Sequence, residues 1–305
     1  MRFESGRLSG LVFCLLAVSQ AVASAAEISP HRALYSMTLA SAKPSSGVLG
    51  ASGAMVYEWG ETCDGWTVQQ RFRLRLIYAD SDPVELTSSL VSWESKDGLN
   101  YRFNERRLKN GDPDEELRGD AHLDGVGGAG KAEFTKPQDK TFVLPAGTLF
   151  PTAHTILLID RANKGETFIS RNVFDGATLE NASQISAVIG PLTPPPAAKH
   201  DNPKAEAVTA NGPASGGKQS GDAKSAEMKP NQAQADTLSN PLLDRPSWRV
   251  RLAFFSADAN EDEPDYELGM RLFENGVSTD MVLDYTDYVV SAKLDDIEPL
   301  PKPSC

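Results

Sequence analysis

Signatures of most enzyme classes and of membrane-embedded proteins are missing from this sequence. Histidine occurs four times and cysteine three times in 305 residues, and no two histidines have the H-x-x-x-H spacing of a zinc protease. There is no G-x-S-x-G element of a serine hydrolase, and no apolar run reaches the ~20 residues of a membrane span. The sequence therefore predicts no cofactor, metal, catalytic residue or transmembrane segment. The sequence does not exclude a catalytic pair of carboxylates, as in glycosidases, that folding brings together from distant positions.

Basic residues are also too few to balance the acidic ones. Asp and Glu number 42 and Lys and Arg 30, which gives a formal net charge of -12 at pH 7. This charge argues against nucleic acid as a partner and against direct adsorption to anionic lipid. A basic protein partner remains compatible with it.

The N-terminus carries an export signal. Two arginines precede an apolar run from Leu8 to Val18, and the small residues of "AVASAAE" follow. This order is typical of a secretory signal peptide. We expect residues 1–26 to be removed by cleavage near Ala25 or Ala26, so that the mature protein is exported.

The cysteine count is then small but informative. Cys14 lies within the apolar run of the signal, so Cys63 and Cys305 are the two that remain in the mature chain. In an oxidising compartment two cysteines suggest one disulfide. Two unpaired thiols are the alternative.

One segment has no aromatic and almost no large aliphatic side chains. Residues 191–240 are rich in Pro, Ala, Gly and Lys and contain no aromatic residue. Such a composition buries too little apolar surface to offset the entropy lost on ordering. We predict a disordered insertion there, within a single domain of residues 27–305.

What the chain does have in quantity is period-two alternation. In "CDGWTVQQRFRLRLIYADS", Trp66, Phe72 and Leu74 share one face while three arginines share the other. The same pattern recurs in six further segments, and "KDG" and "NG" turns separate several of them. Many short strands joined by hairpin turns predict a mainly antiparallel β fold.

A single stretch changes to helical spacing. In "LPAGTLFPTAHTILLIDRANKG", Pro151 is a start signal and Gly165 a stop signal. We predict a helix of about three turns whose apolar side chains, Ile156 and Leu157 among them, cover the concave side of a curved sheet. His154 lies on this helix, where it either faces a cavity or packs as an ordinary core or surface residue; we favour the latter.

The remaining motifs favour loops. "GVGGAGKA" from Gly125 to Ala132 resembles a phosphate-binding loop, but Ala132 replaces the Ser or Thr that holds magnesium, and strand residues follow instead of a helix. The acidic stretch from Asp112 to Glu116 lacks the pattern of a calcium loop. We expect both to be solvated loops.

Taken together, "HRALYSMTLA", "ETCDGW", "LPAGTLFPTAHT", "RNVFDGA" and the terminal cysteine resemble the EipB-like cell-envelope integrity proteins of alphaproteobacteria. The resemblance implies a periplasmic location and an antiparallel β-spiral, or half-barrel, wrapped around one helix. It also implies closure of the spiral by a disulfide that maps onto Cys63 and Cys305, and a role in envelope maintenance without an assigned enzymatic activity.

Three hypotheses of function follow. The first is a non-enzymatic protein that binds a lipid, lipoprotein or peptide segment in a concave apolar groove. The second is a scaffold that contacts envelope proteins without a small ligand, and the third is a peptidoglycan or polysaccharide hydrolase. Candidate groove-lining residues are Tyr35, Met37, Trp66, Phe72, Leu74, Ile156 and Leu157.

Overall fold

The structure, a computed structural model, describes residues 27–195, 240–256 and 263–305. The expected signal peptide, with Cys14, and residues 196–239 of the expected insertion lie outside the described residues. Strand β10 continues through Pro191 to Thr193, so the ordered chain runs slightly further than the composition suggested.

The described residues form one antiparallel sheet of fourteen strands in the order β8-β7-β6-β5-β4-β3-β2-β1-β14-β13-β12-β11-β10-β9. Every neighbouring pair is antiparallel, and every pair except β1 with β14 is adjacent along the chain. The strands are β1 (His31–Ala42), β2 (Val48–Glu61), β3 (Gly65–Tyr78), β4 (Val84–Ser95), β5 (Asn100–Lys109), β6 (Asp112–Leu123), β7 (Gly130–Lys136), β8 (Lys140–Leu144), β9 (Phe168–Val173), β10 (Ser183–Thr193), β11 (Ser247–Phe255), β12 (Tyr266–Phe273), β13 (Ser278–Asp284) and β14 (Tyr288–Pro299).

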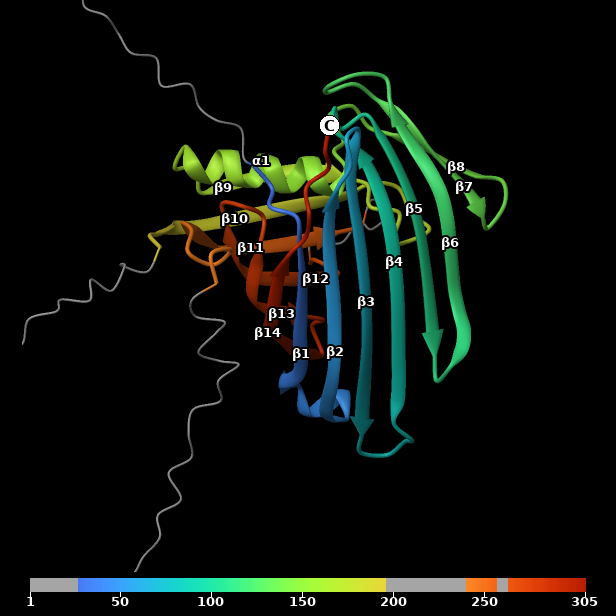
Figure 1. Cartoon of the computed structure of the whole chain (residues 1–305). Coiled ribbons are helices and arrows are strands. Elements are labelled where there is room, and N and C mark those ends of the chain that lie inside the picture. The colour runs from blue at the N-terminus through green and yellow to red at the C-terminus, as the bar shows by residue number, and fades with distance from the viewer. Residues whose placement is uncertain (1–26, 196–239, 257–262) are drawn as a thin grey trace, which may run out of the picture.

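The pairing of β1 with β14 joins two meanders into one curved sheet. The first meander runs from β1 to β8 and the second from β9 to β14. The sheet does not close, although Leu149 forms an isolated parallel bridge with Val173 of β9. The result is a half-barrel in which β1 to β6 form one wall and β9 to β13 the other (Figure 1). This confirms the predicted β-spiral.

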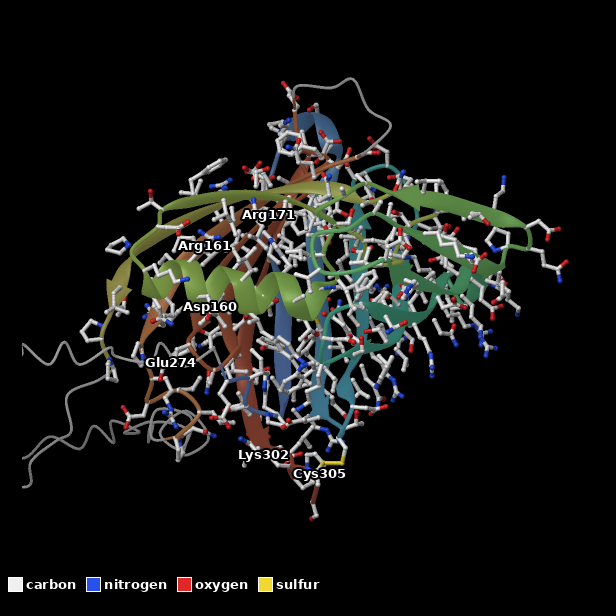
Figure 2. The ribbon with its side chains drawn as sticks, turned by 90° about the horizontal axis from the view of Figure 1, so that it is seen from above. Asp160, Arg161, Arg171, Glu274, Lys302 and Cys305 are labelled. Atoms are coloured by element: carbon white, nitrogen blue, oxygen red, sulfur yellow. A yellow bond between two sulfur atoms is a disulfide. The ribbon has the colours of Figure 1, made fainter. Side chains whose placement is uncertain are left out.

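Helix α1 (Pro151–Asn163) connects the two meanders and lies along the concave side of the sheet (Figures 1 and 2). Pro151 begins it, and Gly165, with a φ of 76°, follows its end. Its side chains Leu158, Ile159 and Ala162 are buried against β9, β10 and β11. Ile156 and Leu157, which the sequence placed on the covering face, are only partly buried beside the same core.

A second part of the interior is filled by aromatic rings. This aromatic cluster lies under β5 to β8 and consists of Tyr101, Phe103, Phe134, Phe150 and Phe174, each at most 4% exposed. Neighbouring ring centroids are 5.0 to 5.9 Å apart, in stacked and edge-on pairs. The Tyr101 hydroxyl donates a hydrogen bond to the carbonyl oxygen of Asp175 at 2.9 Å. The cluster is therefore densely packed and its buried hydroxyl is paired.

Two predicted loops have different outcomes. The glycine-rich segment forms the hairpin connection between β6 and β7, as expected, and its last residues enter β7. The prediction for Asp112 to Glu116 was wrong, because this stretch begins β6. Glu115 and Glu116 lie opposite arginines of β5, and Arg107 forms an ion pair with Glu115 at 2.8 Å. Such cross-strand pairs allow an acidic stretch to form a strand.

Candidate functional site

A cavity of about 240 Å³ lies between the two walls of the half-barrel, next to helix α1. We call it the central cavity. Its lining residues are His31, Tyr35, Met55, Tyr57, Trp59 and Gln70 from β1 to β3, His154, Thr155 and Leu158 from α1, and Leu252, Leu268, Met270, Leu272, Gly276, Ser278, Met281 and Leu283 from β11 to β13 and their connections.

The walls of the central cavity are mainly apolar and carry no formal charge. Leucine and methionine make up eight of the side chains that line it, and none of its described lining residues is Asp, Glu, Lys or Arg. Burial, together with the charge of Arg171, lowers the pKa of His154 to about 4. Burial also lowers the pKa of His31. Both imidazoles are therefore neutral near pH 7, and the cavity favours an uncharged occupant.

Two polar atoms of the cavity walls have no hydrogen-bond partner. Among the described residues, Trp59 Nε1 and His154 Nε2 are the buried side-chain nitrogens left unpaired. Each side chain is only 4% exposed. By contrast, His31 Nδ1 donates to the carbonyl oxygen of Ser29 at 2.8 Å, and the Tyr35 hydroxyl donates to the carbonyl oxygen of Ser278 at 2.8 Å. Unpaired buried groups of this kind are rare in folded proteins.

Helix α1 is anchored by a carboxylate from the opposite wall. Glu94 of β4 is 3% exposed and accepts hydrogen bonds from the backbone amides of Thr152 and Ala153, both at 2.7 Å. The residue before the helix, Phe150, supplies no side-chain cap, so Glu94 takes that role from the sheet. Burial raises the pKa of Glu94 to about 7, and the two amide donors oppose this rise. The Glu94 carboxylate fixes the start of the helix, and the helix in turn positions His154 and Thr155 in the cavity wall.

The candidate groove residues end up in different places. Of those named from the sequence, Tyr35 lines the central cavity. Met37 and Leu74 are buried in the core between β1, β3 and β14, with Phe72 partly buried beside them. Trp66, Ile156 and Leu157 are partly buried against the core under α1. A ligand-contacting role for all seven stays a prediction.

Sequence reasoning missed most of the cavity wall. Met55, Tyr57 and Trp59 alternate along β2 and therefore share one face of the strand, but this alternation gives no sign that the face borders an open space. His154 is buried, as an ordinary core residue is, yet its Nε2 atom has no partner. Detecting the space requires the β1–β14 pairing, which brings β11 to β13 opposite β2.

The disulfide joins Cys63 to Cys305, with their Cα atoms 5.7 Å apart. It ties the C-terminal tail to the connection between β2 and β3, apart from helix α1 (Figure 2). The tail is also held near the start of β1, where the amide of Leu300 donates to the carbonyl oxygen of Pro30 at 2.9 Å. Cys63 and Cys305 are both exposed, so the bridge is accessible to reductant.

Comparison with known proteins identifies the family. The model of the EipB-like family matches residues 22–213 and 217–301. The chain belongs to the EipB-like family. Within this family it is similar to the cell envelope integrity protein EipB of Brucella abortus (strain 2308), with 30% identity over 275 residues that cover 89% of this chain and 84% of EipB.

A solved structure supports the same fold. The chain is similar to the crystal structure of a β-barrel-like protein from Brucella abortus, described as a domain of unknown function, with a TM-score of 0.73 and 25% identity. The match covers 91% of this chain and all of that one. Membership of the EipB-like family therefore accounts for the half-barrel, and the homology to EipB supports a cell envelope integrity protein. None of the described helices is long and apolar enough to cross a membrane.

Proposed function

We propose that this protein maintains the cell envelope from the periplasm by binding an apolar segment of a lipid, lipoprotein or peptide in the central cavity. The observation that carries the proposal is the cavity itself, an uncharged space with walls of leucine and methionine between α1 and both walls of the sheet. Concave, mostly apolar sites with a few polar groups are the usual form of a ligand-binding site. The protein then acts by binding and not by catalysis.

The size of the cavity limits the occupant. A cavity of ~150 Å³ in a protein core is large enough to bind benzene, and sites for drug-sized ligands start near ~300 Å³. At about 240 Å³, the central cavity fits one aromatic or branched side chain, or the end of one acyl chain. A whole lipid does not fit inside, so we propose that the remainder of the ligand stays outside the cavity.

The composition of the walls suits occupants that vary in shape. Met55, Met270 and Met281 come from three different strands and line the cavity together. Methionine side chains are unbranched and polarisable, and they adapt to irregular apolar partners. We therefore propose a class of related apolar segments as ligands.

A pair of matched variants tests the proposal. Leu268→Phe adds a ring to a half-buried side chain of the cavity wall, and the control Leu294→Phe makes the same change at a half-buried position of β14 that does not line the cavity. Protein purified from the periplasm is examined by native mass spectrometry. We expect a co-purifying lipid or peptide on the wild type and on Leu294→Phe, and a several-fold lower occupancy on Leu268→Phe. Equal occupancy in all three proteins, or none in any, would contradict the proposal.

A further inference from the structure

The two unpaired nitrogens of the central cavity carry information about the ligand. The indole of Trp59 can only donate a hydrogen bond, through Nε1, and the neutral imidazole of His154 can accept or donate one at Nε2. Both side chains line the same cavity and both atoms lack a partner. Burying such groups unpaired opposes folding. Two such groups in the wall of one apolar cavity would be stabilised by a ligand group that supplies the missing partner.

The indole of Trp59 is held too tightly to turn toward another acceptor. Its ring packs edge-on against Tyr57, with centroids 6.3 Å apart, and near the ring of His31. Gly276, whose φ is 86°, closes the space behind it: a Cβ atom there would lie 3.2 Å from Trp59 Cζ3 and 2.8 Å from Ile28 Cδ1. The close packing fixes the orientation of the ring and therefore of its N–H.

The matching group on the ligand is neutral. No ionised side chain is among the described lining residues, and a carboxylate moved from water into uncharged apolar walls loses its hydration without gaining a counter-ion. Arg171 acts on His154 electrostatically but does not line the cavity, and its guanidinium donates to the carbonyl oxygen of Ser170 at 2.7 Å. An ester, amide or hydroxyl oxygen meets the requirement, because it accepts a hydrogen bond without carrying charge.

We propose that the central cavity selects neutral amphiphiles: an apolar chain or ring bearing one ester, amide or hydroxyl oxygen that accepts a hydrogen bond from Trp59 Nε1 and pairs with His154 Nε2. This inference rests on the proposed function, since it names the chemical class of the ligand held in the same cavity. Fatty-acid carboxylates and purely apolar molecules are the classes that the cavity disfavours.

The test uses two probes that share a six-carbon acyl chain, methyl hexanoate and sodium hexanoate, on the intact mature protein at pH 7. The chain has four tryptophans, so the indole N–H signal of Trp59 is assigned by nuclear magnetic resonance from its loss in Trp59→Phe. We expect methyl hexanoate to shift this signal saturably and to bind at least tenfold more tightly than hexanoate. Equal or tighter binding of hexanoate would overturn the inference.

Two phenylalanine variants separate the polar contacts from packing. Trp59→Phe and His154→Phe each remove one unpaired nitrogen and keep an aromatic ring, and we expect each to weaken binding of methyl hexanoate about tenfold. The control Trp93→Phe changes a half-buried tryptophan outside the cavity lining and is expected to bind like the wild type. If Trp59→Phe fails to fold, the affinity of His154→Phe for methyl hexanoate, compared with that of the wild type, tests the inference on its own.

Failure of this inference is distinguishable from failure of the proposed function. Toluene serves as an apolar probe without oxygen. If toluene and methyl hexanoate bind with equal affinity to the wild type and to both cavity variants, the selection for a neutral polar group is wrong while apolar binding stands. If no probe binds and the Trp59 N–H contacts only water, both the inference and the proposed cavity site are wrong.

Discussion

The aromatic cluster and the central cavity are two regions of one half-barrel interior with opposite packing. In the aromatic cluster, rings from β5, β7, the residue before α1 and the residue after β9 contact one another, and the buried Tyr101 hydroxyl has a hydrogen-bond partner. In the central cavity, leucines and methionines surround an open space, and Trp59 Nε1 and His154 Nε2 have no hydrogen-bond partner. The same sheet thus encloses one densely packed region whose buried hydroxyl is hydrogen-bonded, and one loosely packed region in which two buried nitrogens are not. We interpret the first as structural and the second as functional.

Helix α1 connects the two regions. Phe150, which directly precedes it, stacks on Tyr101 in the aromatic cluster with centroids 5.1 Å apart, and Glu94 binds the amides of its first turn. His154, Thr155 and Leu158 then form part of the cavity wall. The densely packed region therefore fixes the start of the helix, and the helix positions one side of the cavity.

The largest expected effect comes from the disulfide, which lies outside both regions and should stabilise them equally. Cys63 and Cys305 are 242 positions apart, and closing a loop of that length stabilises the folded state by at most about 5 kcal/mol in the chain-entropy model. We expect Cys305→Ser to lower the melting temperature markedly, and reductant to do the same to the wild type. Equal melting curves with and without reductant would contradict this expectation.

The second prediction compares the two regions by one substitution. Leu117 beside the aromatic cluster and Leu272 in the cavity wall are 1% and 2% exposed. Leu→Ala in a core costs about 2 to 5 kcal/mol, and a side chain that already borders a void has fewer contacts to lose. We expect Leu117→Ala to fall near the upper end of this range and Leu272→Ala near the lower end in urea unfolding. Equal losses would show that the two regions are packed alike.

The third prediction concerns pH and two buried titrating groups, His154 of α1 and Glu94 of β4, which binds the start of α1. The pKa of Glu94 is raised to about 7 in the folded state, so this group makes the protein less stable as pH rises from about 4.5 to 7. The pKa of His154 is lowered to about 4, so this group makes it more stable as pH rises from about 4 to 6.5. Each shift of about 2.5 units corresponds to about 3 kcal/mol, and in the wild type the two effects oppose each other.

Single variants should expose these opposing effects. Relative to wild type, the free energy of unfolding of Glu94→Gln should increase between pH 4.5 and 7, and that of His154→Phe should decrease between pH 4 and 6.5. Urea unfolding at several pH values measures both. Other buried groups, such as Glu105 and His31, are common to all three proteins. If the free energy of unfolding of both variants changed with pH in the same way as that of the wild type, the pKa shifts of Glu94 and His154 would be contradicted.

Much of the fold was predictable because it depends on local patterns. Period-two alternation marked seven of the fourteen described strands, although the start of β6 was expected to be a loop. Pro151 and Gly165 marked the helix ends, and the cysteine count with the family resemblance indicated the disulfide. The cavity was not predictable in this way, because it depends on the pairing of β1 with β14 and on side chains far apart in the chain. The role of Glu94 was hidden for the same reason, since helix caps are normally supplied by adjacent residues and Glu94 lies 58 residues before Thr152.

The most direct test of the central claim is an envelope-integrity assay in cells. A strain that lacks this protein is supplied with wild type, Leu268→Phe or Leu294→Phe at equal periplasmic levels, and its survival in membrane-disrupting detergent is measured. The account predicts that wild type and Leu294→Phe restore survival and that Leu268→Phe, which places a larger side chain in the wall of the central cavity, does not. Full restoration by a folded Leu268→Phe protein would contradict the claim that the cavity carries the function.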